Sequence, residues 1–187
     1  TTVVAVANKQ ARPIAEVIGK VTVINSEFIT ETISENLTDA LRFESAIQME
    51  NAGTRFGSSG INIRGIGKNR VAIEVDGITN AKQFSLGSYS NATSQFPETD
   101  LGKSIEILNG PASTVYGSDA IGGIVSIHTW DPQDLTRISD DNSYTKFRLG
   151  YDGKTHGRVI SALTAWESES FDGILAATQR DGKGLIN

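Results

Sequence analysis

The spacing of glycines between two apolar runs constrains this chain more than any other feature. Segment 105–127 reads IEILNGPASTVYGSDAIGGIVSI, in which fourteen residues separate the two runs and include Gly110, Pro111, Gly117 and Gly122. Glycine permits positive φ values and close approach of two backbones, and proline fixes φ and removes a hydrogen-bond donor. The pattern therefore predicts two strands joined by a tight connection that holds at most a turn or two of helix.

Other parts of the first 130 residues predict short elements separated by loops. Alternating apolar and polar residues favour strands over 20–24, 61–64 and 71–75, and Asp76-Gly77 is a strong turn signal. Asn25 or Ser26 is suited to capping a short helix after the first of these strands. A second helix is predicted over 37–43, because its apolar residues share one face. Residues 52–60 and 79–96 are predicted to be loops, the second one long and polar.

The pattern of apolar and polar residues changes after residue 143. Residues 144–151 alternate apolar and polar side chains, and 156–167 and 171–180 are two further runs of strand length. Strands of about ten residues joined by turns are typical of an antiparallel barrel wall. Residues 131–142 carry Pro132 and four aspartates, and we place a domain junction there.

Composition excludes several classes of function. The formal net charge is −5, and the densest group of basic residues is Lys68–Arg70, so we expect no nucleic-acid partner. The chain has no cysteine, which rules out thiolate sites and disulfides. Residues 1–20 lack the pattern of a signal peptide, so an exported protein would have lost its signal from this sequence. No apolar stretch approaches the roughly 18–20 residues of a membrane helix, and a membrane role would have to rely on β-strands.

The glycines and polar residues do not form a recognisable catalytic site. Gly60–Gly65 has the gap of a phosphate-binding loop, but Ile66 stands where the lysine is required. His128 and His156 are the two histidines; we interpret the first as a sheet-edge residue and the second as solvated, and together they make a poor metal site. Asp140–Asn142 is interpreted as an acidic turn. We therefore expect no catalytic residue, no metal, no cofactor and no enzymatic activity.

Taken together, the remaining motifs resemble the plug domain of TonB-dependent outer-membrane transporters. They are Ile63-Arg64-Gly65, Arg70 through Val75-Asp76-Gly77, Ile105-Glu106, Gly110-Pro111-Ala112-Ser113, Tyr116-Gly117, Ala120 and Gly122-Gly123. The resemblance covers roughly residues 1–130. It implies an α+β plug domain, with a small mixed β-sheet, short helices and long loops, followed by the first antiparallel strands of a transmembrane β-barrel. The expected domains are a TonB box-like segment at 1–8, the plug at 9–135 and the start of the barrel at 136–187, with about three strands.

The resemblance also implies roles for particular residues. An N-terminal segment resembles a TonB box, which pairs by strand addition with a periplasmic TonB-type energy-coupling protein; a plain leading strand would look the same. This segment comprises Thr2, Val3, Val4, Ala5 and Val6. Ligand-binding candidates lie in the two loops and are Arg55, Phe56, Lys82, Gln83, Phe84 and Tyr89. Residues expected to shape the plug or its interface with the barrel are Arg64, Gly65, Arg70, Asp76, Gly77, Glu106, Gly110, Pro111, Tyr116, Gly117, Gly122 and Gly123. Asn109 stands where the family often has arginine.

The subgroup and the ligand are suggested by two runs of residues. Asn62–Ile66 with Asn69–Val71, and Thr178–Gly182, look most like haem and haemoglobin receptors. Those receptors often place a histidine in the apical loop of the plug, and 79–96 contains none; Tyr89 could supply an oxygen ligand instead. The resemblance thus implies an iron-containing ligand, haem first and ferric siderophores next, and a location in the outer membrane of a Gram-negative bacterium. An isolated, water-soluble plug that acts in signalling is the alternative.

Overall fold

The computed structural model of the chain describes residues 3–4, 12–17, 19–32, 34, 37–50, 60–80, 84–86, 89–91, 99–139, 141–152 and 156–181. These residues belong to two compact units, 1–129 and 130–187. We expected the plug to end at residue 135, whereas the contacts divide the chain between Thr129 and Trp130.

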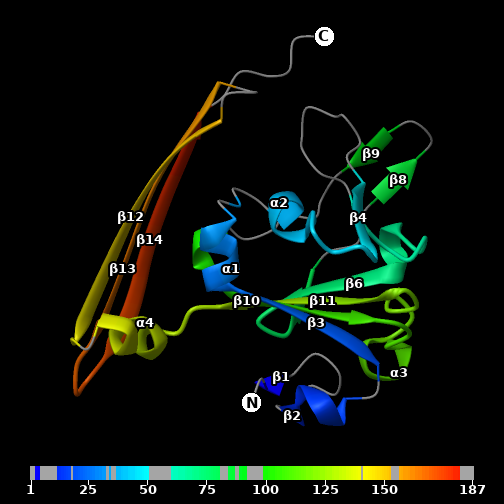
Figure 1. Cartoon of the computed structure of the whole chain (residues 1–187), viewed down its shortest axis with the longest axis horizontal. Coiled ribbons are helices and arrows are strands. Elements are labelled where there is room, and N and C mark those ends of the chain that lie inside the picture. Colours follow the sequence, from blue (N-terminus) through cyan, green and yellow to red (C-terminus); the bar gives the residue numbers. More distant parts are fainter. Residues whose placement is uncertain are drawn as a thin grey trace. The chain divides into compact units, whose positions relative to one another are not determined.

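A five-stranded mixed sheet forms the centre of the first unit (Figure 1). Its strands, in spatial order, are β3 (Lys20–Asn25), β10 (Gly102–Asn109), β11 (Gly123–Thr129), β6 (Val71–Val75) and β7 (Ile78–Thr79). The β11–β6 pair is parallel and the other pairs are antiparallel. The small mixed sheet predicted for a plug domain is therefore confirmed.

Two short helices cover one face of this sheet, which we call the helix face. Helix α1 (Ser26–Glu31) begins after Asn25, whose side chain accepts a hydrogen bond from Phe28 N at 3.0 Å, as the capping signal predicts. Helix α2 (Leu37–Leu41) follows and is shorter than predicted. The alternating strand residues Ile105, Ile107, Val125 and Ile127 bury their side chains against those of the helices, which include Ile29 and Leu41. This cluster is the larger core of the unit.

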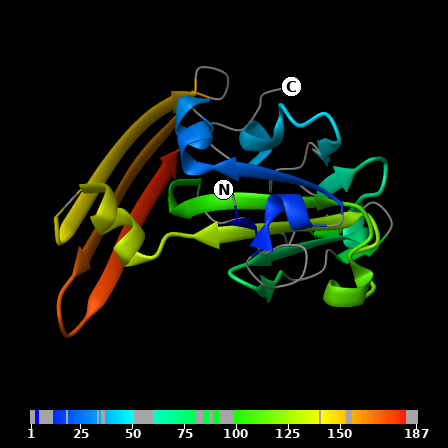
Figure 2. The same ribbon diagram turned by 60° about the horizontal axis from the view of Figure 1, so that its bottom comes forward.

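The opposite face of the sheet, which we call the ribbon face, carries a smaller core and the N-terminal residues. Strand β1 (Val3–Val4) pairs antiparallel with β2 (Arg12–Pro13), and a 3₁₀ turn, η1 (Ile14–Glu16), follows. Figures 1 and 2 both place this β1–β2 ribbon on the side of the sheet away from α1 and α2. The small core of this face contains Ala72, Leu108, Ala112, Ala120 and Ile124.

Short elements surround the sheet. Strands β4 (Ile47–Glu50) and β5 (Gly60–Ile63) pair, as do β8 (Phe84–Leu86) and β9 (Tyr89–Asn91). The remaining elements of this unit are η2 (Lys68–Arg70), η3 (Thr99–Leu101) and α3 (Ser113–Tyr116). The prediction of an uninterrupted loop over 79–96 is wrong, because Thr79 is in β7 and a hairpin lies within the segment. Residues 52–59 of the other predicted loop lie outside the described residues.

The second unit is a three-stranded antiparallel sheet with one helix packed on it. Its strands are β12 (Ser143–Asp152), β13 (Gly157–Glu167) and β14 (Asp172–Asp181), which agree with the three predicted strands. One face exposes apolar side chains such as Phe147 and Leu149, as a barrel wall facing lipid does. Helix α4 (Pro132–Ser139) packs on these strands and was not predicted, although Pro132 at its first position is a helix-start signal. Among the described residues, every helix is too short or too polar to cross a membrane.

Candidate functional site

The ligand-binding candidates are only partly described. Phe84 and Tyr89 lie on the β8–β9 hairpin, whose register pairs Phe84 with Asn91 and Leu86 with Tyr89. The sequence therefore brings these two aromatic residues onto one short ribbon. Arg55, Phe56, Lys82 and Gln83 lie outside the described residues. Their roles remain predictions.

The predicted TonB-binding segment contributes a strand to the first unit. Val3 lies opposite Pro13 and Val4 opposite Arg12, and the Val4 side chain is 1% exposed. We expected a β-prone segment free at the terminus; the described part of it is instead paired within the chain. Thr2, Ala5 and Val6 lie outside the described residues.

Two of the sequence motifs form turns with backbones in the left-handed region. Arg64 (φ 52°) and Gly65 (φ 84°) reverse the chain after β5, and Asp76 (φ 49°) and Gly77 (φ 80°) do so between β6 and β7. The Asp76 carboxylate accepts hydrogen bonds from Thr129 N at 2.8 Å and from Thr129 Oγ1 at 2.7 Å. These two bonds hold Thr129, the last residue of the first unit, against the β6–β7 turn. We placed Arg64 on a strand, but its side chain is exposed on a turn.

The glycine-rich connection is a close-packed loop between β10 and β11. Ala112 N donates to Ala120 O at 2.8 Å, which closes the loop around α3, and Gly117 (φ 81°) ends that helix. A Cβ atom on Gly123 (φ 147°) would lie 2.4 Å from Leu108 O. A positive φ accounts for Gly117, and close backbone packing together with a positive φ accounts for Gly123, as the spacing predicts.

The beginning and the end of the same loop are positioned by neighbouring segments. Gly122 N donates to Arg70 O at 2.8 Å, and a Cβ atom on Gly122 would lie 2.7 Å from Ile66 Cγ2. The Arg70 side chain is exposed. At the other end, Gly110 (φ 146°) precedes Pro111, which is exposed. The loop is therefore held through its backbone.

A row of polar side chains crosses the ribbon face of the sheet. Glu74 on β6, Ser126 on β11 and Glu106 on β10 lie opposite one another on adjacent strands. The two glutamates are 5% and 6% exposed, and Ser126 is fully buried. Ser126 Oγ donates to Glu74 Oε1 at 2.8 Å. We call these three residues the acidic row. Glu106 was predicted at a plug–barrel interface; Glu74 and Ser126 were missed, although a glutamate inside the apolar run 71–75 was a visible signal.

Two further titratable groups border the acidic row. His128 Nε2 lies 3.6 Å from Glu106 Oε1, and this contact raises the pKa of His128 above its ordinary value despite partial burial. Burial, reinforced by the charges of Glu74 and Glu106, raises the pKa of Tyr116 to about 12. His128 is the last residue but one of β11; it lies opposite Ser104 of β10, and the pairing of β11 with β6 ends one residue earlier, at Ile127.

Asn109 replaces the family's frequent arginine at the end of β10. Its side chain is 4% exposed, and neither its Oδ1 nor its Nδ2 has a hydrogen-bond partner within the described structure. An uncharged amide cannot make the ion pair that an arginine would make with a carboxylate of a barrel wall. An ion pair at this position is therefore excluded for this chain.

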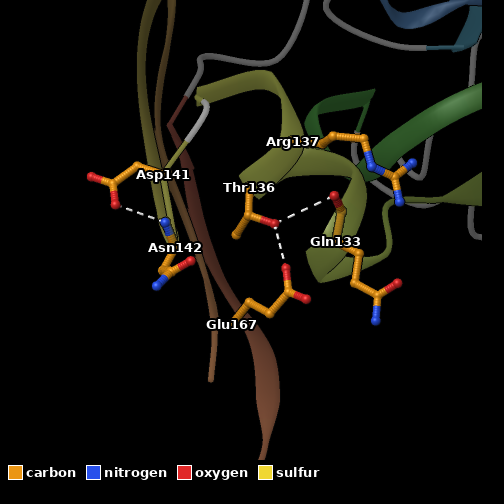
Figure 3. Close-up of a pocket in the computed structure, with 6 residues that line it drawn as sticks. All are labelled: Gln133, Thr136, Arg137, Asp141, Asn142 and Glu167. Atoms are coloured by element: carbon orange, nitrogen blue, oxygen red, sulfur yellow. Dashed lines mark hydrogen bonds between the residues drawn. The ribbon is translucent and has the colours of Figure 1, made fainter. Parts of the chain in front are cut away.

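A polar pocket lies within the second unit, between α4 and the ends of two strands (Figure 3). Its lining residues are Gln133, Thr136, Arg137, Asp141, Asn142 and Glu167. The buried Thr136 donates from Oγ1 to Glu167 Oε2 at 2.9 Å, which fastens α4 to the end of β13. The described residues contain no group of three or more histidine or carboxylate side chains suited to a metal ion.

Comparison with known sequences agrees with the resemblance. Residues 13–124 match the family described as TonB-dependent Receptor Plug Domain. Hemoglobin-haptoglobin-binding protein A of Haemophilus influenzae is 32% identical over 164 residues, which cover 82% of this chain and 15% of that protein. The vitamin B12 transporter BtuB of Vibrio vulnificus is 35% identical over 130 residues, 68% of this chain and 20% of that protein. The chain thus spans a minor part of the length of these relatives.

Comparison with solved structures shows the same fold. The ferripyoverdine receptor of the outer membrane of Pseudomonas aeruginosa superposes with a TM-score of 0.74 at 17% identity, covering 97% of this chain and 22% of that one. The FrpB iron transporter from Neisseria meningitidis gives 0.71 at 21% identity, covering 88% and 25%. The sequence match over 13–124 contains β3, β6, β7, β10 and the close-packed loop and ends at the start of β11, and the chain belongs to the TonB-dependent receptor plug domain family.

Proposed function

We propose that this chain is the plug and the first barrel strands of an outer-membrane receptor that imports an iron-containing ligand, with haem or haemoglobin as the first candidate. The observation that carries the proposal is the similarity to a haemoglobin–haptoglobin-binding protein, which covers 82% of the chain. The 164 aligned residues exceed the length of the first unit, residues 1–129, so the likeness includes part of the second unit. The family consists of receptors, so no catalytic role is proposed.

The structure supports different roles for the two units. The first unit has a buried core on both faces of its sheet and a close-packed loop, which suit a plug that closes a pore. The second unit has an exposed apolar face, which suits the lipid-facing side of a barrel wall. Ligand recognition is assigned to the loops that contain Arg55, Phe56 and residues 82–84, and to Tyr89.

Binding to purified full-length protein tests the ligand. We expect haemin and haemoglobin to bind, with a change in the Soret absorbance of haemin, and a ferric siderophore and cobalamin to bind at least about tenfold more weakly. Tyr89→Phe should alter the Soret spectrum if the phenol oxygen ligates the iron, whereas Tyr151→Phe on the second unit should not. Equal affinity for all four probes, or no haemin binding, would contradict the haem assignment.

Cobalamin is the second candidate ligand, because the similarity to a vitamin B12 transporter reaches 35% identity. Ferric siderophores are a further alternative. The same titration separates the three classes. A water-soluble plug that acts in signalling is distinguished by growth: a strain that lacks the gene should fail to use haem as its iron source if the protein is an importer, and should grow normally if it is a signalling module.

Energy coupling is proposed to act through residues 2–6, which pair as a strand with a TonB-type protein. A peptide of residues 1–8 should bind the C-terminal domain of that protein. Val4→Pro should abolish binding, because proline removes a backbone donor and fixes φ. Val4→Thr, which keeps the β-branched shape, should bind like the parent peptide. Absence of binding by the parent peptide would contradict this part of the proposal.

A further inference from the structure

The last residues of β11, 127–129, are paired less completely than the rest of the strand. The parallel pairing of β11 with β6 ends at Ile127, and within the described structure the two residues that follow pair only with β10. That remaining pairing is irregular, with a shift of register between Gly102 and Ser104. We call residues 127–129 the end of β11. The backbone gives this end fewer partners than the middle of the strand has, so nearby side chains contribute more to holding it.

Asp76 on the β6–β7 turn holds the end of β11 from one side. Its carboxylate accepts hydrogen bonds from N and Oγ1 of Thr129, and its own N donates to Ile127 O at 2.9 Å. The two bonds to Thr129 are exposed to water, and exposed hydrogen bonds open more readily than buried ones. The stability of this end therefore depends on the other contacts that it makes.

His128 makes such a contact with β10. Its Nε2 lies 3.6 Å from Oε1 of the buried Glu106, which is within the range of an ion pair but beyond that of a hydrogen bond. Nε2 is itself buried and has no hydrogen-bond partner within the described structure. A neutral imidazole gains little from a carboxylate at this distance, whereas a charged one is attracted to it. The contact therefore holds the strand only while the imidazole is protonated.

The charges around His128 favour its protonated form. Glu106 on β10 contacts the imidazole, and Asp76 on the β6–β7 turn and Glu74 on β6 also attract its positive charge. Partial burial of the imidazole acts in the opposite direction. The pKa of His128 is raised above its ordinary value of 6.5, and the interaction with Glu106 is the largest cause.

We propose that His128 is a positioning residue whose protonated imidazole holds the end of β11 on β10, and that loss of this proton leaves the end of β11 held only by Asp76 and by the irregular pairing. Thr129 is the last residue of the first unit, so this pH-dependent contact acts on the segment through which the first unit continues into the second. The inference goes beyond the proposed function, because it requires neither an imported ligand nor a TonB-type partner.

The direction of the pH dependence follows from the pKa of His128. In the folded chain this pKa is raised above the ordinary value of 6.5. The stabilisation is therefore complete below pH 6.5 and is lost as the pH rises through the raised pKa. Mildly acidic conditions hold the end of β11 on β10, and mildly alkaline conditions loosen it.

Hydrogen exchange in the full-length protein, followed by mass spectrometry of peptides, tests the proposal. Protection of residues 127–129 is measured at pH 6 and pH 8.5 as the ratio of intrinsic to observed exchange rate, which removes the pH dependence of the chemistry itself. One unit of difference in pKa changes this ratio by at most about tenfold, and we expect protection to fall about threefold or more at pH 8.5. His128→Gln should abolish the difference, whereas His156→Gln, on the second unit, should leave it intact.

Two further variants separate the charge from the structure. His128→Lys keeps a positive charge at both pH values, so protection of residues 127–129 should stay high at pH 8.5. Glu106→Gln removes the carboxylate that the imidazole faces and should flatten the pH response, which keeps the test decisive if His128→Gln disturbs the fold. Equal protection of the parent protein at the two pH values overturns the proposal. A response that persists in both glutamine variants, or a lysine variant that loosens as the parent does, also overturns it.

Discussion

Among the glycines that the structure describes, Gly123 leaves the least room for a side chain. Its φ of 147° is disfavoured for residues with a side chain, and an added Cβ atom would lie 2.4 Å from a backbone oxygen of the adjacent strand. That oxygen belongs to Leu108 near the end of β10, a strand that is paired on both sides, so it cannot move without disturbing this pairing. Two separate costs, backbone strain and overlap, therefore act on any substitution here.

Gly123→Ala should lower the free energy of unfolding by about 3 kcal/mol or more, because strain at such a position and the steric overlap add. Gly77→Ala is the matched control: Gly77 also has a positive φ (80°), but an added Cβ atom would meet nothing within 4 Å. The control should cost about 1–2 kcal/mol, the strain alone. Urea denaturation followed by circular dichroism measures the free energy of unfolding of both variants. Equal losses would show that the neighbouring backbone moves to make room for the added Cβ atom, and would contradict the prediction.

Tyr116 gives a spectroscopic signature of the acidic row. Burial, with the charges of Glu74 and Glu106, raises its pKa to about 12. In an absorbance titration at 295 nm, one of the four tyrosines should ionise near pH 12, and Tyr116→Phe should remove that step. Tyr151→Phe, on the second unit, should leave it. Because the folded pKa lies above the unfolded value of 10.0, the stabilisation is present below pH 10 and is lost towards pH 12. Loss of the late step in the Tyr151 variant alone would refute the assignment.

At the scale of elements, the β6–β7 turn holds the end of β11. Asp76 accepts two hydrogen bonds from Thr129, the residue after which the first unit ends. Asparagine also tolerates the left-handed backbone, but it has one acceptor oxygen in place of two. Asp76→Asn should therefore lower the free energy of unfolding by about 1 kcal/mol. In a Thr129→Val background the hydroxyl bond is already absent, and the same change should cost less. Additive costs, measured by denaturation in a double-mutant cycle, would show that the two side chains act independently.

The elements that were predicted from the sequence are those whose own residues carry a recognisable pattern. Alternation located β3, β6 and β12, the length of two further runs located β13 and β14, and the Asn25 cap located the start of α1. The hairpin β8–β9 was missed because its strands are only three residues long and lie within a polar segment. Helix α4 was missed because its aspartates suggested a junction, although Pro132 and the acidic first turn also mark a helix start.

The candidate site was less accessible to sequence than the fold. The close-packed loop was predicted because positive φ values and close backbone contacts require glycine, and the glycines are visible in the sequence. The acidic row was not, because Glu74, Ser126 and Glu106 are far apart in the chain and meet only through the pairing of three strands. Pairing of β1 with β2 was equally hidden, since a β-prone terminal segment does not show what it pairs with.

At the scale of the whole molecule, the two units differ in how they exclude water. The first buries apolar side chains on both faces of its sheet. In the second, α4 packs on the strands, and the apolar side chains of Phe147 and Leu149 are 77% and 80% exposed. An exposed apolar face of this kind fits contact with lipid and favours association in water. The units should therefore behave differently when separated.

Residues 1–129 produced alone should unfold cooperatively in urea as a monomer, because both clusters of buried residues lie within them. Residues 130–187 should associate in water at micromolar concentration and become monomeric in detergent. Phe147→Lys with Leu149→Lys should reduce that association without affecting residues 1–129, whereas Lys146→Gln, on the other face of β12, should not. Light scattering and urea denaturation measure these outcomes. A non-cooperative transition for residues 1–129 would mean that the core of this unit needs the second unit in order to fold.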